Sequence, residues 1–276
     1  MFESVSVDEV KKFWDRRPCN VRHSNLEVGT KEYFDAVETR RYFVEPHIRT
    51  FAQFDRWKGK RVLEIGCGIG TDSINFSRAG ADLTVVDLSE KSLELCQRRF
   101  DVFGLKARFL QGNAEELNQF LEPQQFDCIY SMGVLHHTPN PPKAFQQLRR
   151  YMGPASELRI MLYARYSWKA LSLFLARGWE SGWNLDRVVA KYSEAQTGCP
   201  VTYIYSFRQV RELLKDFEIT SIAKDFIFPY KVSSYVAYEY QPHWYFRMLP
   251  RPLFKALEKK LGWQLLIVAT NKRVTT

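Results

Sequence analysis

The stretch that decides how this sequence is interpreted is Val62-Leu63-Glu64-Ile65-Gly66-Cys67-Gly68-Ile69-Gly70. It begins with the apolar character of a buried strand, and three glycines then follow at alternate positions. Glycine adopts backbone angles that are closed to other residues and lets a ligand approach the main chain. A helix that starts after such a turn offers unpaired N–H groups. The stretch therefore predicts a strand, a tight turn and a helix that together receive a ligand.

The surrounding sequence predicts an α/β fold. From Arg61 to about Tyr163, short apolar runs alternate with longer amphipathic stretches, which is typical of parallel strands joined by helices. We expect strands at 61–65, 82–87, 106–111, 126–131 and 157–163, each covered on both faces. A helix is expected over 89–103, with Ser89 as its cap. Open α/β sheets bind ligands at the carboxyl ends of their strands, which is where the glycine turn falls.

Polar or small residues mark three further strand ends. Asp87 closes the second strand, at the distance where an acidic residue meets ribose hydroxyls in such folds. Asn113 follows the third strand and has the groups to read an adenine edge. Ser131 and Met132 come at the end of the fourth. Four elements of one nucleoside site thus occur in the right order along the chain.

On these motifs the chain resembles the class I S-adenosylmethionine-dependent methyltransferases, within them the small-molecule branch similar to the ubiquinone and menaquinone enzymes. The resemblance covers roughly residues 59–163. It implies a Rossmann-like sheet of seven strands with helices on both faces, and S-adenosylmethionine as cofactor, with S-adenosylhomocysteine as product. By this resemblance, the residues that hold the cofactor are Glu64, Gly66, Cys67, Gly68, Gly70, Asp72, Asp87, Leu88, Asn113, Ala114, Ser131 and Met132.

Other nucleotide-binding classes fit less well. Thr71 stands where the third glycine of the dinucleotide motif G-x-G-x-x-G would be, and no G-K-[ST] follows to cradle phosphates. Asn140-Pro141-Pro142 superficially matches a motif of amino-group methyltransferases, but Lys143 replaces the aromatic residue of that motif. We interpret this segment as the opening of a helix over 143–151.

His136 and His137 are the candidate catalytic residues, because they follow the fourth strand and an imidazole has a pKa suited to removing a proton at neutral pH. Packing and hydrogen bonding are the alternative role for this pair. Methyl transfer needs no obligatory catalytic residue, because alignment of the reactants supplies much of the rate.

The acceptor site is expected outside the cofactor-binding core of residues 59–163. Residues 164–206 form an insertion too long for a plain connection, and 207–276 complete the core around a second insertion at 230–262. Residues 1–58 are expected to form a helical lid, with aromatic packing as the alternative. The candidate substrate-binding residues are Tyr33, Tyr192, Glu194, Gln196, Tyr203 and Tyr205; for those after residue 164, a capped surface loop is the alternative.

The amino-acid composition gives only weak information about the binding partners of the protein. The 40 Lys and Arg exceed the 31 Asp and Glu, a formal charge of +9 that favours anionic partners. Basic pairs such as Arg40-Arg41 and Arg98-Arg99 are interpreted as solvated helix faces. The aromatic and basic stretch 243–260 suits either an interfacial segment or a packed helix, and we favour packing because the amphipathic pattern is short.

Five scattered cysteines predict neither a disulfide framework nor a metal site. No apolar stretch has the length of a membrane span, and no signal peptide is recognised, so we expect a cytoplasmic monomer or homodimer. The predicted function is methylation of a small metabolite, with oxygen favoured over nitrogen or carbon as the acceptor atom. The alternatives are an RNA or protein methyltransferase and a non-catalytic protein that only binds the cofactor.

Overall fold

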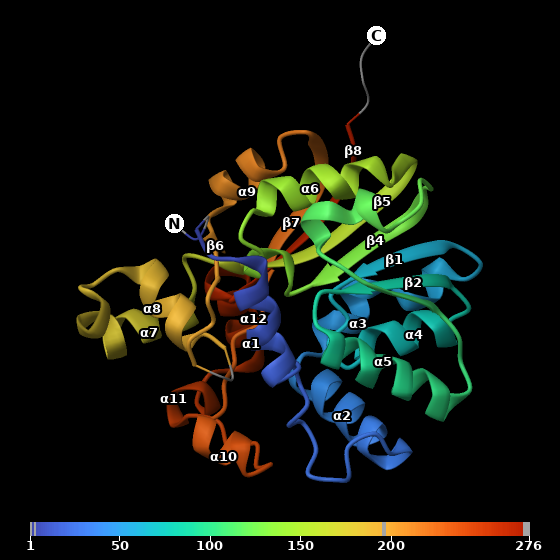
Figure 1. Ribbon diagram of the computed structural model, residues 1–276. Helices are drawn as coiled ribbons and strands as arrows, with labels where there is room; N and C mark the ends of the chain where they lie inside the picture. Colours follow the sequence, from blue (N-terminus) through green and yellow to red (C-terminus); the bar gives the residue numbers. More distant parts are fainter. Residues whose placement is uncertain (1, 3, 195–196, 273–276) are drawn as a thin grey trace.

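A computed structural model describes residues 2, 4–194 and 197–272 and shows one sheet between two layers of helices (Figure 1). The sheet has eight strands, seven of them in the order β3-β2-β1-β4-β5-β8-β7, while the short β6 pairs with the end of β5. All pairings are parallel except those of β8 with β5 and β7. The strands are β1 (Arg61–Ile65), β2 (Asp82–Asp87), β3 (Arg108–Gln111), β4 (Phe126–Met132), β5 (Met152–Ala164), β6 (Ile204–Tyr205), β7 (Phe217–Asp225) and β8 (Gln264–Asn271).

The helices before the fifth strand are α1 (Val7–Arg16), α2 (Lys31–Val44), α3 (His47–Ala52), α4 (Thr71–Arg78), α5 (Glu90–Phe103) and α6 (Pro141–Arg150). Those after it are α7 (Trp168–Arg177), α8 (Leu185–Tyr192), α9 (Phe207–Leu213), α10 (Val232–Val236), α11 (Trp244–Arg247) and α12 (Arg251–Leu261). Short 3-10 turns lie at Phe54–Trp57, Ala114–Gln119, Leu135–His137 and Gly178–Ser181.

Two of the helix starts predicted from the sequence are confirmed. The Ser89 hydroxyl accepts a hydrogen bond from the backbone N–H of Ser92 at 3.0 Å and so caps α5. The Asn140 side chain accepts one from the N–H of Lys143 at 3.1 Å, with two prolines in the first turn of α6. In both cases a side-chain acceptor satisfies an N–H group that lacks an intrahelical partner.

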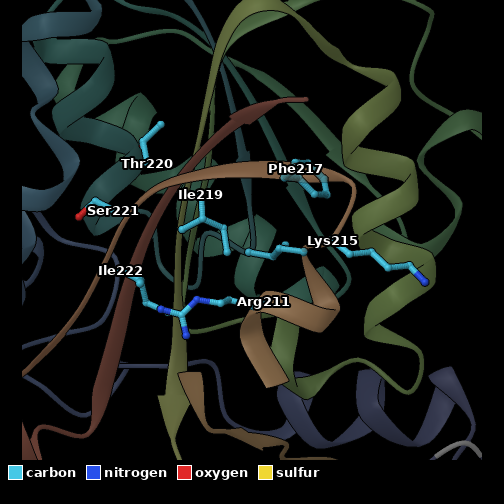
Figure 2. A pocket seen from close by; sticks show the side chains of 8 residues that line it. Arg211, Lys215, Phe217, Ile219, Thr220, Ser221 and Ile222 are labelled. Carbon is cyan, nitrogen blue, oxygen red and sulfur yellow. The ribbon is translucent and has the colours of Figure 1, made fainter. Parts of the chain in front are cut away.

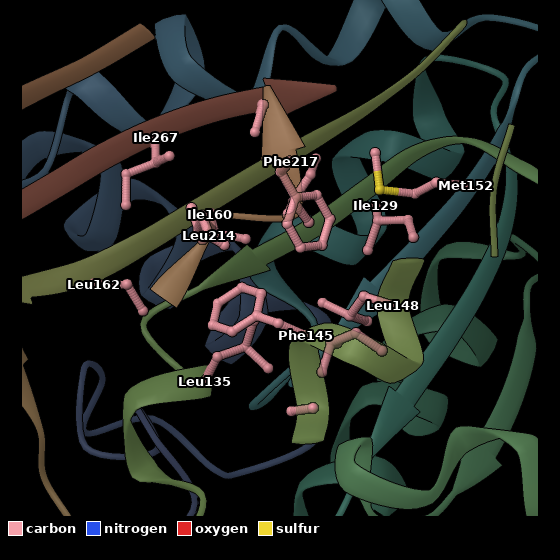
Figure 3. Close-up of a cluster of buried hydrophobic side chains, with 14 of the residues drawn as sticks. Ile129, Leu135, Phe145, Leu148, Met152, Ile160, Leu162, Leu214, Phe217 and Ile267 are labelled. Atoms are coloured by element: carbon pink, nitrogen blue, oxygen red, sulfur yellow. The ribbon is translucent and has the colours of Figure 1, made fainter. Parts of the chain in front are cut away.

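The core lies on both faces of the sheet. On one face, residues of β1, β4 and β5 pack against α6 and α9, as Figure 3 shows for Ile129, Ile160, Phe145 and Leu214. On the other face, α3, α4 and α5 cover a second cluster that contains Val62, Val85 and Tyr130. Burial of strand residues on both faces confirms the doubly covered sheet expected from their apolar sequence.

The fifth strand starts earlier than predicted. It was expected from Glu157, because Gly153 and Pro154 disfavour strands, but it begins at Met152, which pairs with Phe126. The register then shifts before Cys128, and Ser156 bridges the irregularity by accepting from the N–H of Gly153 at 2.7 Å. A bulge accommodates Gly153 and Pro154, which a regular strand would exclude.

Both long insertions extend from the same edge of the sheet. The segment with α7 and α8 leaves the carboxyl end of β5, and the segment with α10 to α12 joins the end of β7 to the start of β8. The pairing of Tyr163 with Gln264, and of Gln264 with Asp225, places these ends side by side. Figure 1 shows the two insertions next to each other, with α1 crossing nearby. The insertions therefore surround the edge at which ligands bind in this type of sheet.

Candidate functional site

The strand order reverses between β1 and β4, and the crevice at their carboxyl ends is the expected ligand site of an open α/β sheet. The structure has a cavity of about 1090 Å³ there. Of the residues expected to hold the cofactor, ten line it: Glu64, Gly66, Cys67, Gly68, Asp72, Asp87, Leu88, Asn113, Ala114 and Met132. Gly70 and Ser131 lie behind the wall.

The glycine turn depends on the absence of a side chain at Gly66. Its φ is +78°, and a Cβ built there would lie 2.3 Å from Cγ2 of Val134, in the loop after β4. Its N–H donates to the carbonyl of Val86 at 2.7 Å, which holds the start of the turn against β2. The turn thus keeps backbone exposed to the cavity while it packs closely against two neighbouring strand ends.

Asp87 supports the same turn from the end of β2. Its Oδ2 accepts from the backbone N–H groups of Cys67 at 2.9 Å and Gly68 at 3.2 Å, and its Oδ1 accepts from Ser89 at 2.8 Å. Burial raises the pKa of this carboxyl above its usual value, although these hydrogen bonds act in the opposite direction. Asp87 therefore shapes the loop in addition to facing the cavity.

A buried charged network lies beside the glycine turn. The Asp72 carboxylate accepts from the hydroxyls of Tyr42 and Tyr130, both at 2.9 Å, and from Arg41 at 3.4 Å. Glu64 is 2 % exposed, and within the described part of the chain its Oε2 has no hydrogen-bond partner. Burial and then the charge of Asp72 raise the pKa of Glu64 to about 8. This carboxyl therefore lies in a place that a cation from a ligand would stabilise.

Arg41, Tyr42 and Tyr130 were not identified from the sequence. The Arg40-Arg41 and Arg98-Arg99 pairs were interpreted as solvated, but Arg40 is 5 % exposed, the Arg99 side chain is fully buried, and Arg41 lines the cavity. Arg40 and Arg41 lie on α2, which packs against α4 and α5. The interpretation was wrong because the Arg40 guanidinium lies 4.1 Å from the Tyr235 ring of the second insertion and Arg99 donates to Glu38 of α2. Short-range sequence patterns do not show these contacts.

The third and fourth strand ends contribute in different ways. The Asn113 side chain accepts from the N–H of Glu115 at 3.0 Å, which fixes the turn that lines the cavity. Met132 faces the cavity. Ser131 instead donates its hydroxyl to the carbonyl of Ile65 at 3.0 Å, so it joins β4 to β1 beneath the site.

The two candidate catalytic histidines occupy different environments. His136 does not line the cavity; its ring is fully buried, 3.9 Å from the ring of Tyr163 and 4.2 Å from that of His137. Burial lowers its pKa well below the usual value, so it stays neutral. A buried, neutral ring in an aromatic stack has the geometry of a packing residue, and no proton acceptor role follows from it.

His137 lines the cavity. Its Nδ1 is 2.8 Å from the carbonyl of Val201, and because a carbonyl only accepts, Nδ1 carries the hydrogen. Its Nε2 lies 3.8 Å from a carboxylate oxygen of Glu194. Burial alone would lower the pKa of His137, but Cys199, 3.6 Å from Nδ1, and Glu194 outweigh it and raise the pKa to about 9. Nε2 is thus the ionisable atom on the cavity side.

The candidate substrate residues divide into two groups. Tyr192 and Glu194 line the cavity, and Gln196 lies outside the described residues. Three tyrosines are placed elsewhere. Tyr33 is buried and donates to the carbonyl of Val21 at 2.7 Å, Tyr203 donates to Pro139 at 3.1 Å, and Tyr205 packs in the core as part of β6. These three do not reach the cavity because their rings stabilise the lid and the base of the insertion.

The cavity also has an aromatic wall that the sequence did not indicate as one surface. It is assembled from the lid, from both insertions and from the residues next to β8, and it includes Trp14, Trp168, Phe226, Phe228, Tyr235, Tyr245, Phe246 and Trp263. The ring of Trp14 lies 5.2 Å from that of His137. Lys169 adds a cation that donates to the carbonyl of Ser193 at 2.7 Å and lies 4.8 Å from the Trp263 ring.

A second cavity, of about 330 Å³, lies between α9 and β7 (Figure 2). It is lined by residues such as Arg211, Lys215, Phe217 and Ile219, and it contains none of the residues at the ends of β1, β2 or β4. We therefore place the functional site in the larger cavity.

The strand order, the glycine turn and the acidic residue at the end of β2 together define the fold of the class I methyltransferases. Residues 62–155 match the methyltransferase domain family. The chain therefore contains a methyltransferase domain of the class I, S-adenosylmethionine-dependent type.

Relatives of known name share this domain. The chain is 34% identical over 100 residues to the ubiquinone biosynthesis O-methyltransferase of Dechloromonas aromatica, covering 36% of this chain and 43% of that enzyme. It is 28% identical over 156 residues to the enzyme of the same name from Hahella chejuensis, covering 56% and 61%. The similarity to these two enzymes thus spans less than two thirds of their length.

Solved structures share the fold over a longer range. Magnesium protoporphyrin IX methyltransferase from Synechocystis, determined with bound S-adenosylhomocysteine, has a TM-score of 0.58 at 14% identity, over 97% of this chain and 100% of that one. The YcgJ protein of Bacillus has a TM-score of 0.57 at 15% identity, over 83% and 99%. At these identities the likeness concerns the fold.

Proposed function

We propose that this protein transfers a methyl group from S-adenosylmethionine to an oxygen atom of a small metabolite. One observation carries the proposal: a single cavity joins the glycine turn and Asp87 on one side to Glu194 and the aromatic wall on the other. Pockets for one ligand measure about 300–1,000 Å³. A cavity of about 1090 Å³ therefore has room for a nucleoside donor and an acceptor together.

The residues beside the glycine turn fit the zwitterionic end of the methionine part. Glu64 is a buried carboxyl with a raised pKa and an unpartnered oxygen, and Arg41 is a cavity-lining guanidinium whose Nε has no partner among the described residues. An ammonium group beside Glu64 and a carboxylate beside Arg41 would satisfy both. The unpartnered oxygen of Glu64 and the unpartnered N–H of Arg41 thus match the ammonium and the carboxylate of the amino-acid moiety.

The other residues that we assign to donor binding lie at the end of β2 or directly after β2 and β3. We assign the ribose to Asp87 and Leu88 and the adenine to Asn113 and Ala114, which line one continuous part of the cavity. Asp87 already accepts three backbone hydrogen bonds, so it would bind the ribose hydroxyls with its remaining acceptor capacity. The cofactor, when bound, supplies a methyl group on a positively charged sulfur, activated for displacement.

The chain contributes alignment, exclusion of water and removal of a proton. As the methyl group forms its new bond to the acceptor oxygen, its bond to sulfur breaks, and the acceptor loses a proton. We assign the proton to Nε2 of His137, the ionisable atom on the cavity side. Trp14 of α1, beside the His137 ring, covers the reaction from the lid.

The acceptor is proposed to be a hydroxylated, largely apolar molecule. The cavity wall that would contact the acceptor is mainly aromatic. Tyr192, Glu194 and Lys169 are the polar groups that would orient the acceptor. Oxygen is favoured because the relatives named above are O-methyltransferases. A deep cavity walled by the lid and both insertions favours a small molecule over RNA or a folded protein, which need a broad open groove.

The test measures donor binding and transfer separately. Calorimetry with S-adenosylmethionine and S-adenosylhomocysteine should show binding at one site. The protein would then be incubated with methyl-labelled S-adenosylmethionine and extracted metabolite pools, fractionated by polarity; label should enter an apolar, hydroxylated fraction. Binding without transfer into any pool would favour a non-catalytic protein, and absence of binding would overturn the proposal.

A further inference from the structure

The exposed apolar side chains are concentrated on the two insertions. Among the described residues, sixteen large apolar side chains are exposed, and twelve of these lie between residues 166 and 183 or between 232 and 261. The most exposed are Tyr166, Leu175, Trp179, Val232, Val236, Trp244 and Met248, each 66–75 % exposed. Exposed apolar groups gathered in this way mark an interaction surface. We name the exposed side of α7, α10, α11 and α12, with the Gly178–Ser181 turn, the cap surface.

The two halves of the cap surface are in contact. The Trp168 ring of α7 lies 6.0 Å from that of Tyr245 and 5.9 Å from that of Phe246, both in α11. Figure 1 shows α7 and α8 on the same side of the molecule as α10 and α11. Two segments about 70 residues apart in sequence thus form one surface, which explains why no single helix in the sequence has the long amphipathic pattern of an interfacial segment.

The cap surface also surrounds an opening of the acceptor cavity. Val232 and Val236 line the cavity and are 68 % and 69 % exposed, so they lie at its rim. Trp168 and Leu173 of α7 and Tyr245 of α11 line it from inside. An apolar molecule that enters between these helices would therefore pass from the cap surface directly to the aromatic wall.

The same segments carry most of the net positive charge of the chain. Residues 165–192 and 230–262 contain eleven Lys and Arg but four Asp and Glu, a net +7 of the chain's +9. Arg247, Arg251, Lys255, Lys259 and Lys260 are all exposed. Surfaces that combine Trp and aliphatic side chains with Lys and Arg bind anionic lipid bilayers through both burial and electrostatic attraction.

We propose that the cap surface docks on an anionic lipid bilayer, with the cavity opening toward the lipid. A second copy of the chain fits less well, because a two-fold interface would bring two such positively charged surfaces together. Within the described residues no helix is long and apolar enough to cross a bilayer. The docking is therefore peripheral, and it does not depend on the methyl transfer proposed above.

The test is co-sedimentation of the full chain with vesicles of phosphatidylcholine alone and with vesicles containing about 30% phosphatidylglycerol. Binding should require the anionic lipid and be reversed by about 0.5 M salt. The emission of the exposed tryptophans should shift to shorter wavelength on binding. Trp179→Ser with Trp244→Ser should reduce partitioning about tenfold or more, and so should Arg247→Glu with Arg251→Glu.

A matched charge reversal, Lys106→Glu with Arg108→Glu at the β3 edge of the sheet, should leave partitioning within about twofold. Calorimetry with S-adenosylmethionine would verify that each variant is folded. Lack of binding to anionic vesicles, or equal binding by the cap-surface and β3-edge variants, would overturn the proposal. A concentration-dependent dimer that is lost with the tryptophan substitutions, without lipid binding, would assign the surface to a second copy instead.

Discussion

The carboxylate of Asp87 lies 2.9 Å from the backbone nitrogen of Cys67, so the end of β2 is hydrogen-bonded to the glycine turn after β1. The residue expected to bind the ribose is thus also part of what holds the turn in shape. Loss of this carboxylate would act on the donor site in two ways, through the missing contact and through the altered loop.

We therefore predict that Asp87→Ala weakens S-adenosylmethionine binding by about one to three kcal/mol, because hydrogen bonds to a charged acceptor are lost and buried N–H groups are left unpaired. Calorimetry would measure this. Asp82→Ala is the control, since Asp82 is exposed at the other end of the same strand. Equal affinities of the wild type and Asp87→Ala would contradict the assignment.

Gly66→Ala should destabilise the fold more than other substitutions at left-handed glycines. A Cβ at Gly66 would lie 2.3 Å from Val134, whereas one at Gly104, which also has a positive φ of +64°, would meet nothing within 4 Å. We expect Gly104→Ala to cost about 1 kcal/mol from backbone strain alone and Gly66→Ala at least about 3 kcal/mol with the overlap added. Urea unfolding measures both, and similar losses would show that the turn relaxes freely.

Much of the fold could be predicted from the sequence because its signals are local. β1 and β2 have the predicted bounds, Ser89 caps the helix that it was expected to cap, and a helix opens at Asn140-Pro141 as expected. The bounds of β5 were not predicted, because a bulge paired across the sheet overrides the breaking tendency of Gly153.

The candidate site was less predictable where distant segments meet. Strand-end residues such as Glu64 and Asn113 could be placed because parallel strands bring their carboxyl ends to one edge. Arg41 and the aromatic wall could not, since they reach the cavity through contacts of the lid and of two insertions. They lie next to one another only because of tertiary packing, which the hydrophobic periodicity of the sequence does not indicate.

Glu64→Gln should stabilise the unliganded protein at alkaline pH while it weakens donor binding. Because the pKa of Glu64 is raised to about 8 in the folded state from 4.5, its contribution to stability is present below pH 4.5 and is lost as the pH rises through 8. The difference in unfolding free energy between variant and wild type should therefore increase by about 4 kcal/mol from pH 5 to pH 8.5. Urea unfolding at several pH values measures it.

The control for this prediction is Glu218→Gln, a substitution of an exposed strand glutamate. Its unfolding free energy is measured at the same pH values as that of Glu64→Gln. Glu64→Gln should also weaken S-adenosylmethionine binding at least about tenfold, because the ammonium loses a charged partner. A variant that binds the donor normally would show that Glu64 has a structural role only.

The last prediction separates the two histidines by the pH dependence of methyl transfer. With a pKa of about 9, His137 is protonated at neutral pH and cannot accept a proton, so the rate should rise tenfold per pH unit from pH 7 and level off near pH 9. His137→Ala should lower the rate by about 10²–10⁴-fold. His136→Phe should largely retain it, because that ring packs against Tyr163 and His137 and does not line the cavity. An acceptor hydroxyl can produce a similar profile, and Cys199→Ala distinguishes the two: it removes the sulfur 3.6 Å from Nδ1 and should move the profile to lower pH only if His137 is the titrating group.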